Sequence, residues 1–194
     1  KSDEDRNFVT TRQLWARWER PETELEVPLG IDQRGDIVRL NFSSHQSPHL
    51  LIGGTTGSGK SEALNTILWG MLEHYSAQEL RLLLIDPKGT ELQEFEDLEW
   101  VQGELGVDAE DALAILDQAV HEMESRYAKF AKAKVKKLSD YNKQVEPMPW
   151  WVIVLDEYAD LTLEPDDKRA VEQRVKKLSA KARAAGIHLI IATQ

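Results

Sequence analysis

The stretch GGTTGSGKS, from Gly53 to Ser61, directly follows an apolar run, HLLI at residues 49–52. From Gly54 onward it matches the full Walker A pattern, Gly-x-x-x-x-Gly-Lys-Ser, which is typical of phosphate-binding loops. Glycines let backbone N–H groups approach phosphate oxygens, the lysine adds a positive charge, and the serine hydroxyl can ligate Mg²⁺. The residues that we expect to bind ATP are Gly54, Thr55, Thr56, Gly57, Ser58, Gly59, Lys60 and Ser61.

The residues on both sides of the loop have the pattern that this motif requires. Residues 62–72 carry apolar side chains at helical spacing, and the run before the loop has the composition of a short buried strand. A helix that starts at the loop directs its free N–H groups and the positive end of its dipole at an anion. Strand, loop and helix therefore follow one another, which favours a phosphate-binding loop over a flexible linker that matches by chance.

A second pattern, WWVIVLDEYAD at residues 150–160, supplies two acids directly after an apolar run. We expect Asp156, at the carboxyl end of a Walker B strand, to hold Mg²⁺ together with Ser61. Glu157 is the additional carboxylate that can polarise a water for attack on the γ-phosphate, as a general base. The two acids would otherwise only cap a strand. The Walker A pattern upstream favours hydrolysis of ATP, with Lys60 and Glu157 as catalytic residues.

Other polar residues near strand ends are weaker candidates for the same site. Gln194 lies at the tip of the last apolar run, where its amide could sense the γ-phosphate. Asp86 and Lys88 follow the run LRLLLI at residues 80–85, and they either face the same crevice or complete a turn. The histidines are expected to be structural and not metal ligands, because they have no zinc-like spacing. They are His45, His49, His74, His121 and His188.

The order of patterns along the chain predicts an α/β fold. Apolar runs at residues 80–85, 150–155 and 187–192 alternate with helical patterns, one beginning near Asp108 and one over residues 166–185 that Gly186 closes. Such alternation indicates a mainly parallel sheet with right-handed crossovers. Before this core we expect a short helix around Trp15 and a β-hairpin from residue 27. The lysine-rich run beyond residue 127 is most simply a solvated helix face.

Composition limits the class of protein. The 194 residues include no cysteine, which excludes disulfides and thiolate zinc sites. No apolar run approaches the ~20 residues that cross a bilayer, so we expect a cytoplasmic segment without membrane contact, whose anchor could lie outside it. A net charge of −10 argues against a generally basic DNA-coating protein but not against a local DNA-contacting loop. Because the chain stops directly after an apolar strand, we also expect a domain truncated at its C-terminus.

Five stretches in this order resemble the motor domain of FtsK/SpoIIIE DNA translocases: PHLLIGGTTGSGKS, LLLIDPKGTEL, EMESRY, VLDEYADL and KARAAGIHLIIATQ. The resemblance implies a RecA-like P-loop NTPase core over residues 27–194, behind a charged helical lead-in over residues 1–26. It also implies a homo-hexameric ring that moves double-stranded DNA with ATP and Mg²⁺. In that pattern Lys60 and Ser61 engage phosphates and Mg²⁺, Asp156 and Glu157 form the Walker B pair, and Gln194 is the sensor-like residue.

The chain also departs from the family pattern. Family motors continue past ATQ, so the arginine finger and the DNA-contacting loops are expected beyond Gln194. Arg183 is a candidate for a role in a neighbouring subunit, although a cation at a helix C-terminus also complements the helix dipole. Related branches of the superfamily move proteins in type VII secretion. Two alternatives therefore stay open, a protein-export motor and a nucleotide-dependent assembly platform, since fold and site do not separate these uses.

Overall fold

A computed structural model of the chain describes residues 9–55 and 57–194. The strands are β1 (Glu26–Ile31), β2 (Ile37–Asn41), β3 (Leu50–Gly53), β4 (Leu80–Ile85), β5 (Trp150–Leu155) and β6 (Ile187–Thr193). The α-helices are α1 (Thr11–Trp15), α2 (Lys60–His74), α3 (Ala109–Ala133), α4 (Leu138–Gln144) and α5 (Pro165–Lys181). Two short 3₁₀ helices, η2 (Gln93–Phe95) and η3 (Asp160–Thr162), follow β4 and β5. No helix in the described part of the chain is long and apolar enough to cross a membrane.

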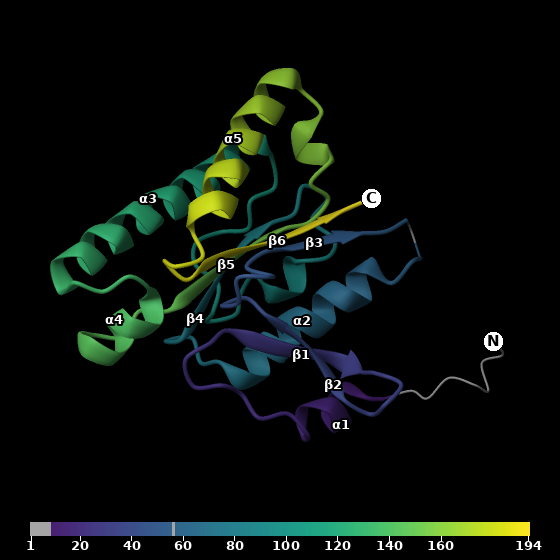
Figure 1. The fold of residues 1–194 in the computed structure, drawn as a ribbon. Helices are drawn as coiled ribbons and strands as arrows, with labels where there is room; N and C mark the ends of the chain where they lie inside the picture. The colour runs from purple at the N-terminus through teal and green to yellow at the C-terminus, as the bar shows by residue number, and fades with distance from the viewer. Residues whose placement is uncertain (1–8, 56) are drawn as a thin grey trace.

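The core is a four-stranded parallel sheet in the order β3-β6-β5-β4, with helices on both faces (Figure 1). Alternate residues of each strand point to opposite faces. In β5, Ile153 and Leu155 pack with α3 and α5, whereas Val152 and Val154 pack with α2 and the hairpin. The predicted α/β fold with a parallel sheet is therefore confirmed. All four strands run the same way, so their carboxyl ends lie along one edge.

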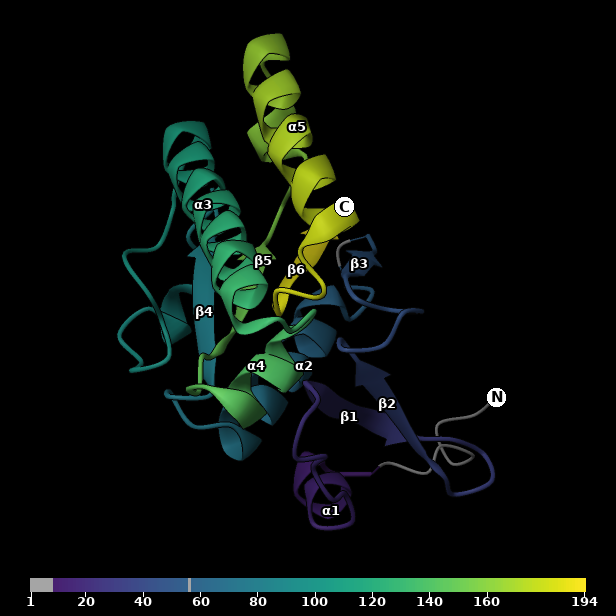
Figure 2. The same ribbon diagram turned by 60° about the vertical axis from the view of Figure 1, so that its left-hand side comes forward.

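The hairpin of β1 and β2 forms a separate antiparallel pair that packs against α2 (Figure 2). Tyr75, which follows α2, accepts a hydrogen bond from the backbone N–H of Glu26 at 2.9 Å and donates to the carbonyl of Glu24 at 3.0 Å. The predicted short helix is α1, and its Leu14 is buried, as is Trp18 beyond its end. The predicted hairpin and lead-in helix are thus present, and together they cover the outer side of α2.

One helix boundary differs from the prediction, and one additional helix is present. The long helix does begin after Asp108, whose side chain accepts a hydrogen bond from the Asp111 N–H. It ends at Ala133 because Lys134 adopts a left-handed backbone with φ 57°, and α4 follows as a separate helix that the sequence pattern did not indicate. The later helix ends at Lys181, four residues before the predicted end.

Gly186 nevertheless has the capping role that was predicted for it. Its φ is +71°, and the Ile187 N–H donates to the Ala182 carbonyl at 3.1 Å while the Gly186 N–H donates to Arg183 at 2.9 Å. This pair of hydrogen bonds is the Schellman arrangement, which needs a left-handed residue. The turn over residues 182–186 therefore continues α5 and directs the chain into β6.

Candidate nucleotide-binding site

The predicted phosphate-binding loop connects β3 to α2 at the carboxyl edge of the sheet. A Cβ at Gly54 would lie 2.2 Å from Oγ and 3.3 Å from Cβ of Ser58, so any other residue there would displace the Ser58 side chain. Gly59 has φ +91° and is the N-cap of α2, which begins at Lys60. The N-terminus of α2 therefore lies at the end of the loop, in the arrangement that binds phosphate in this class of site.

The loop forms one wall of a cavity with a volume of about 340 Å³. The cavity is lined by Thr55, Gly57, Gly59, Lys60, Ser61, Glu62, Lys88, Thr90, Glu91, Asp156, Glu157 and Gln194. The last six come from segments that follow β4, β5 and β6, so the fold brings together residues that are far apart in the sequence. Gly54 and Ser58 shape the loop instead of lining the cavity, and Thr56 lies outside the described residues.

Lys60 and Asp156 form a buried ion pair across the cavity. The Lys60 ammonium donates a hydrogen bond to Oδ1 of Asp156, and the two side chains are 8% and 2% exposed. Burial raises the pKa of Asp156 above its ordinary value, and the hydrogen bond from Lys60 opposes this shift. The ion pair places the lysine of the loop and the acid of the Walker B strand in direct contact, with Ser61 as the next residue along α2. A hydroxyl and a carboxylate are the hard oxygen donors that Mg²⁺ prefers, so these two side chains fit a magnesium site.

Glu157 is held in an unusual conformation beside this pair. Its φ is 48°, a left-handed value that costs free energy for a residue other than glycine and that recurs at functional sites. The Gln194 side-chain amide donates to Oε2 at 2.8 Å, and the Gln194 N–H donates to Oε1 at 3.3 Å. The ammonium of Lys88 lies 3.0 Å from Oε2. Burial raises the pKa of Glu157, but the hydrogen bonds from Lys88 and Gln194 outweigh burial and lower it overall.

Asp86 and Lys88 have different roles: one completes a turn and the other faces the cavity, which are the two possibilities that the sequence left open. The Asp86 carboxylate is fully buried and accepts hydrogen bonds from successive backbone N–H groups, so it completes a turn. These donors are Lys88, Gly89, Thr90, Glu91 and Leu92, at 2.9 to 3.1 Å. Lys88 faces the cavity. Sequence reasoning missed the contact between Lys88 and Glu157, as well as Thr90 and Glu91 in the cavity wall. The turn-forming DPKG motif was the only signal for this segment.

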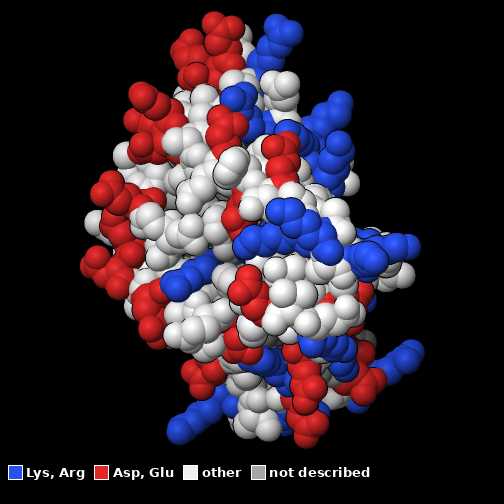
Figure 3. All heavy atoms as spheres, turned by 90° about the vertical axis from the view of Figure 1, so that its left-hand side faces the viewer, with Lys and Arg blue, Asp and Glu red and all other residues white. Residues whose placement is uncertain are grey.

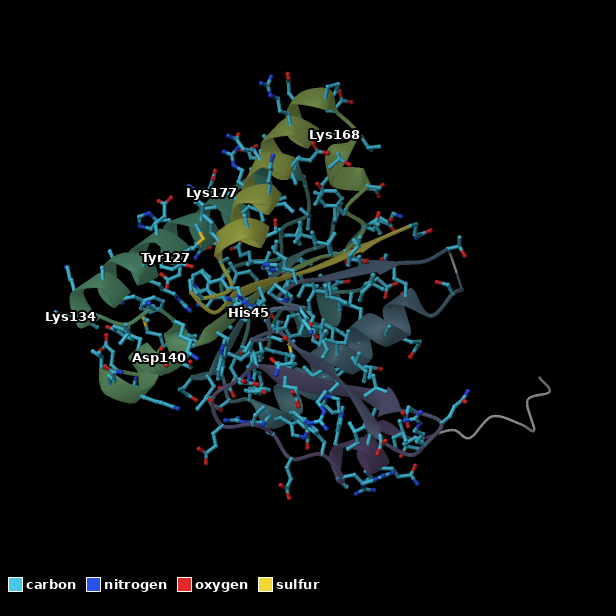
Figure 4. The ribbon with its side chains drawn as sticks, in the orientation of Figure 1. His45, Tyr127, Lys134, Asp140, Lys168 and Lys177 are labelled. Atoms are coloured by element: carbon cyan, nitrogen blue, oxygen red, sulfur yellow. The ribbon has the colours of Figure 1, made fainter. Side chains whose placement is uncertain are left out.

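Arg183 lies away from the nucleotide cavity. It belongs to the turn before β6, at the opposite edge of the sheet, where it lines a second cavity with His45 and Lys137. Figure 4 labels His45 in that region, below the C-terminal end of α5. The structure therefore does not bring Arg183 to the cavity of its own chain.

Two of the histidines connect the segment before β3 to β6. His188 is fully buried, and its Nδ1 lies 2.9 Å from the carbonyl of Pro48, so this nitrogen carries the proton. His49 accepts a hydrogen bond from the Leu189 N–H at 3.0 Å. Burial lowers the pKa of His188 to about 3. These are structural contacts, and they hold β3 beside its neighbour.

Comparison with known proteins identifies the family of the chain. The profile of the FtsK/SpoIIIE family matches residues 9–154 and 144–194. DNA translocase FtsK of Streptococcus pyogenes serotype M3 is 37% identical over 198 residues, covering 96% of this chain and 24% of that protein. DNA translocase FtsK of Leptospira interrogans is 38% identical over 184 residues, covering 90% of this chain and 19% of that protein. The chain thus spans a quarter or less of the length of these relatives.

Solved structures show the same fold. The cytoplasmic domain of the type VII secretion ATPase EccC of Thermomonospora curvata superposes with a TM-score of 0.74 at 29% identity, over 96% of this chain and 23% of that one. The conjugation coupling protein TcpA of pCW3, solved with ATPγS, superposes with a TM-score of 0.73 at 26% identity, over 91% and 49% of the two chains. The predicted P-loop fold is confirmed by these neighbours. With a family profile that matches almost every described residue, the chain belongs to the FtsK/SpoIIIE family.

Proposed function

We propose that the chain is an ATP-hydrolysing motor domain that couples turnover to the movement of double-stranded DNA. The observation that carries this proposal is the convergence of Lys60, Ser61, Asp156 and Glu157 on one cavity at the carboxyl edge of the sheet. A phosphate-binding lysine, an acid for a metal and a second acid for water are the parts that hydrolysis of a phosphoanhydride requires. The proposed movement of DNA is supported by the relatives named DNA translocase FtsK.

In this proposal each residue has one task. The loop N–H groups and Lys60 hold the phosphates, and Ser61 and Asp156 hold Mg²⁺. The bound Mg²⁺ supplies positive charge that neutralises the phosphate oxygens. Glu157 accepts the proton of the attacking water, and Gln194, which donates to both oxygens of that carboxylate, fixes its orientation. Lys60 has to exchange Asp156 for phosphate when the nucleotide binds.

We further propose that the motor works as a homo-hexameric ring around DNA in the cytoplasm. The chain has a net charge of −10, and acidic side chains gather along one edge of the face in Figure 3 while basic ones lie at its centre and opposite edge. We therefore expect only a limited, basic part of the surface to contact DNA phosphates. Arg183, at the sheet edge away from its own cavity, contributes to hydrolysis only if it meets the cavity of a neighbouring subunit. The motor core is residues 27–194, and residues 1–26 are its lead-in.

The test is the ATPase rate of the full-length protein with and without duplex DNA, at one salt concentration. We expect duplex DNA to stimulate hydrolysis and ATP to drive displacement of a third strand from a triplex substrate. A Lys60→Met protein is the control for contaminating ATPases and should show neither activity. Hydrolysis that duplex DNA leaves unchanged, together with no strand displacement, would contradict the DNA-moving role.

Protein export is a second candidate function. The observation that favours it is the superposition on EccC, a type VII secretion ATPase, over 96% of this chain. A related EccC structure holds a signal sequence peptide. Replacing duplex DNA by secretion-signal peptides in the same ATPase experiment separates the two functions, because only the proper cargo should stimulate hydrolysis. A protein that binds nucleotide tightly but does not turn it over with either cargo would instead be an assembly platform.

A further inference from the structure

The segment after β4 is an unusually well fixed loop on the wall of the nucleotide cavity. The carboxylate of Asp86 is fully buried and accepts hydrogen bonds from the backbone N–H groups of residues 88–92. Hydrogen bonds to a buried charged acceptor are stronger than those between neutral groups. The loop is therefore anchored from within, and the backbone that carries Lys88 has little freedom to move.

The side chain of Lys88 extends from this fixed backbone into the cavity. It is 46% exposed and lines the same cavity as Lys60. Its ammonium lies 3.0 Å from Oε2 of Glu157 and 3.6 Å from Oδ2 of Asp160. Glu157, in contrast, is only 4% exposed at its side chain, so the contact joins a half-exposed lysine to a buried carboxylate. Two ammonium groups in this cavity thus contact the two Walker B acids, Lys60 with Asp156 and Lys88 with Glu157.

We propose that Lys88 distinguishes a nucleoside triphosphate from a diphosphate, by exchanging Glu157 for the terminal phosphate. The inference rests on the proposed function, because it needs a nucleotide in this cavity. A terminal phosphate carries more negative charge than one carboxylate and lies on the side of the cavity where Glu157 acts on water. When the lysine moves to the phosphate, Glu157 keeps its hydrogen bonds from Gln194 and loses the cation that occupied Oε2. The carboxylate is then free to accept a proton only when a triphosphate is present.

If Lys88 exchanges Glu157 for phosphate, the two residues should be coupled in their effect on triphosphate affinity. A lysine with only a structural role would not show this coupling. Lys88 must break its ion pair with Glu157 before it can contact a triphosphate, and the free energy of breaking this pair weakens triphosphate binding. A diphosphate leaves the ion pair intact. Neutralising the carboxylate should therefore strengthen triphosphate binding through Lys88, and the strengthening should vanish when Lys88 is absent. Coupling of this kind is measured by a double-mutant cycle.

The experiment measures dissociation constants for ATPγS and for ADP, each with Mg²⁺, by calorimetry on the full-length protein. We expect Lys88→Met to raise the dissociation constant for ATPγS about tenfold and to change that for ADP less than twofold. Lys88→Arg should retain most of the ATPγS affinity. Lys168→Met is the matched control, because Lys168 is 55% exposed on α5 at the top of Figure 4 and contacts Glu172 at the surface. This control should leave both affinities unchanged.

The second arm repeats the measurements in Glu157→Gln and in Glu157→Gln/Lys88→Met. ATPγS should bind more tightly to the single variant than to wild type, and this gain should disappear in the double variant. If Lys88→Met weakened the binding of ATPγS and of ADP equally, the proposal would be overturned, and the lysine would have only a role in the structure of the loop. Unchanged ATPγS affinity would overturn it too. Wild-type protein that binds neither nucleotide would refute the proposed function as well, whereas tight binding without DNA-stimulated hydrolysis would refute only the motor role.

Discussion

Lys60 and Asp156 are ion-pair partners although 96 residues separate them in the sequence. Both side chains are almost fully buried, so each charge depends on the other for its stability in the folded protein. A buried ion pair of this kind is costly to break from one side, because the remaining charge has no partner. Lys60 therefore contributes to the stability of the fold, in addition to the role in phosphate binding that we propose for it.

Lys60→Met is expected to abolish nucleotide binding and to lower the free energy of unfolding by about 3 kcal/mol, because Asp156 stays buried without its cation. Urea denaturation measures the loss. The double variant Lys60→Met/Asp156→Asn should regain most of the stability without regaining nucleotide binding. A single variant as stable as wild type would show that Asp156 finds another partner.

Glu157→Gln is expected to bind nucleotide but to hydrolyse it about 10²–10⁴-fold more slowly, because the amide cannot accept the proton of the attacking water. Phosphate release measures turnover, and the dissociation constant for ATPγS confirms that the site is intact. Turnover close to that of wild type would transfer the role of general base to another acid of the cavity wall, and Glu91 would be tested next.

Asp86→Ala is expected to lower the free energy of unfolding by about 3 kcal/mol, because five backbone N–H groups lose a buried, charged acceptor. The midpoint of urea denaturation measures this. Asp97→Ala removes an exposed carboxylate from the same segment and should change the midpoint little. Equal effects of the two substitutions would mean that water satisfies the loop without Asp86.

Arg126→Met is expected to lower the free energy of unfolding by about 2 kcal/mol. The guanidinium is 1% exposed and joins α3 to the segments before β5 and β6, through the carbonyls of Pro149 at 2.8 Å and Ala185 at 2.9 Å. Methionine fills the space without making these hydrogen bonds. Arg174→Met is the control, since it breaks an ion pair with Asp117 at the surface and should cost ~0.5 kcal/mol. Similar thermal midpoints for both variants would contradict the structural role of Arg126.

The stability of the protein should fall as the pH is lowered below about 6.5. Burial holds the pKa of His188 at about 3, although the hydrogen bond to the Pro48 carbonyl opposes this shift, and the charges of Arg126 and Arg183 act in the same direction as burial. Between the unfolded pKa near 6.5 and the folded one, only the unfolded chain takes up the proton, so folding is favoured above this window and opposed within it. The loss from one such histidine approaches ~1.4 kcal/mol per pH unit.

Urea denaturation at pH 7 and pH 5 tests this for wild type and for His188→Gln. The variant should lose about 2 kcal/mol less than wild type between the two pH values, since its residue 188 does not titrate. Its stability at pH 7 can differ from that of wild type without affecting this comparison. Parallel pH dependence in both proteins would mean that His188 is not the titrating group.

Short-range spacing allowed the parts of the site to be predicted. The pattern from Gly54 to Ser61 identifies a loop whose residues are consecutive, and Asp156 with Glu157 follows an apolar strand that parallel pairing takes to the same edge. Hydrophobic runs were enough to predict the parallel sheet. These features depend on neighbours in sequence, which one chain displays directly.

What sequence reasoning missed depends on partners far along the chain. Nothing near Lys88 indicates that its ammonium meets Glu157, because that contact forms only after β4 and β5 pair. Arginine is usually found at the protein surface, yet Arg126 is buried because it donates hydrogen bonds to carbonyl groups of two other segments. The end of α3 at Lys134 was missed since left-handed backbone at a lysine has no signal comparable to glycine.

The position of β3 at the edge of the parallel sheet also has a consequence for the order of folding. Within the described part of the chain, β3 pairs with β6 alone, and the His49–Leu189 contact that joins them spans 140 residues. Contacts between such distant segments form late, because a long loop must be closed first. During synthesis α2 and the hairpin emerge well before β6 does. The phosphate-binding loop can therefore have a helix beside it before its strand joins the sheet, and nascent chains should acquire nucleotide affinity only after β6 has left the ribosome.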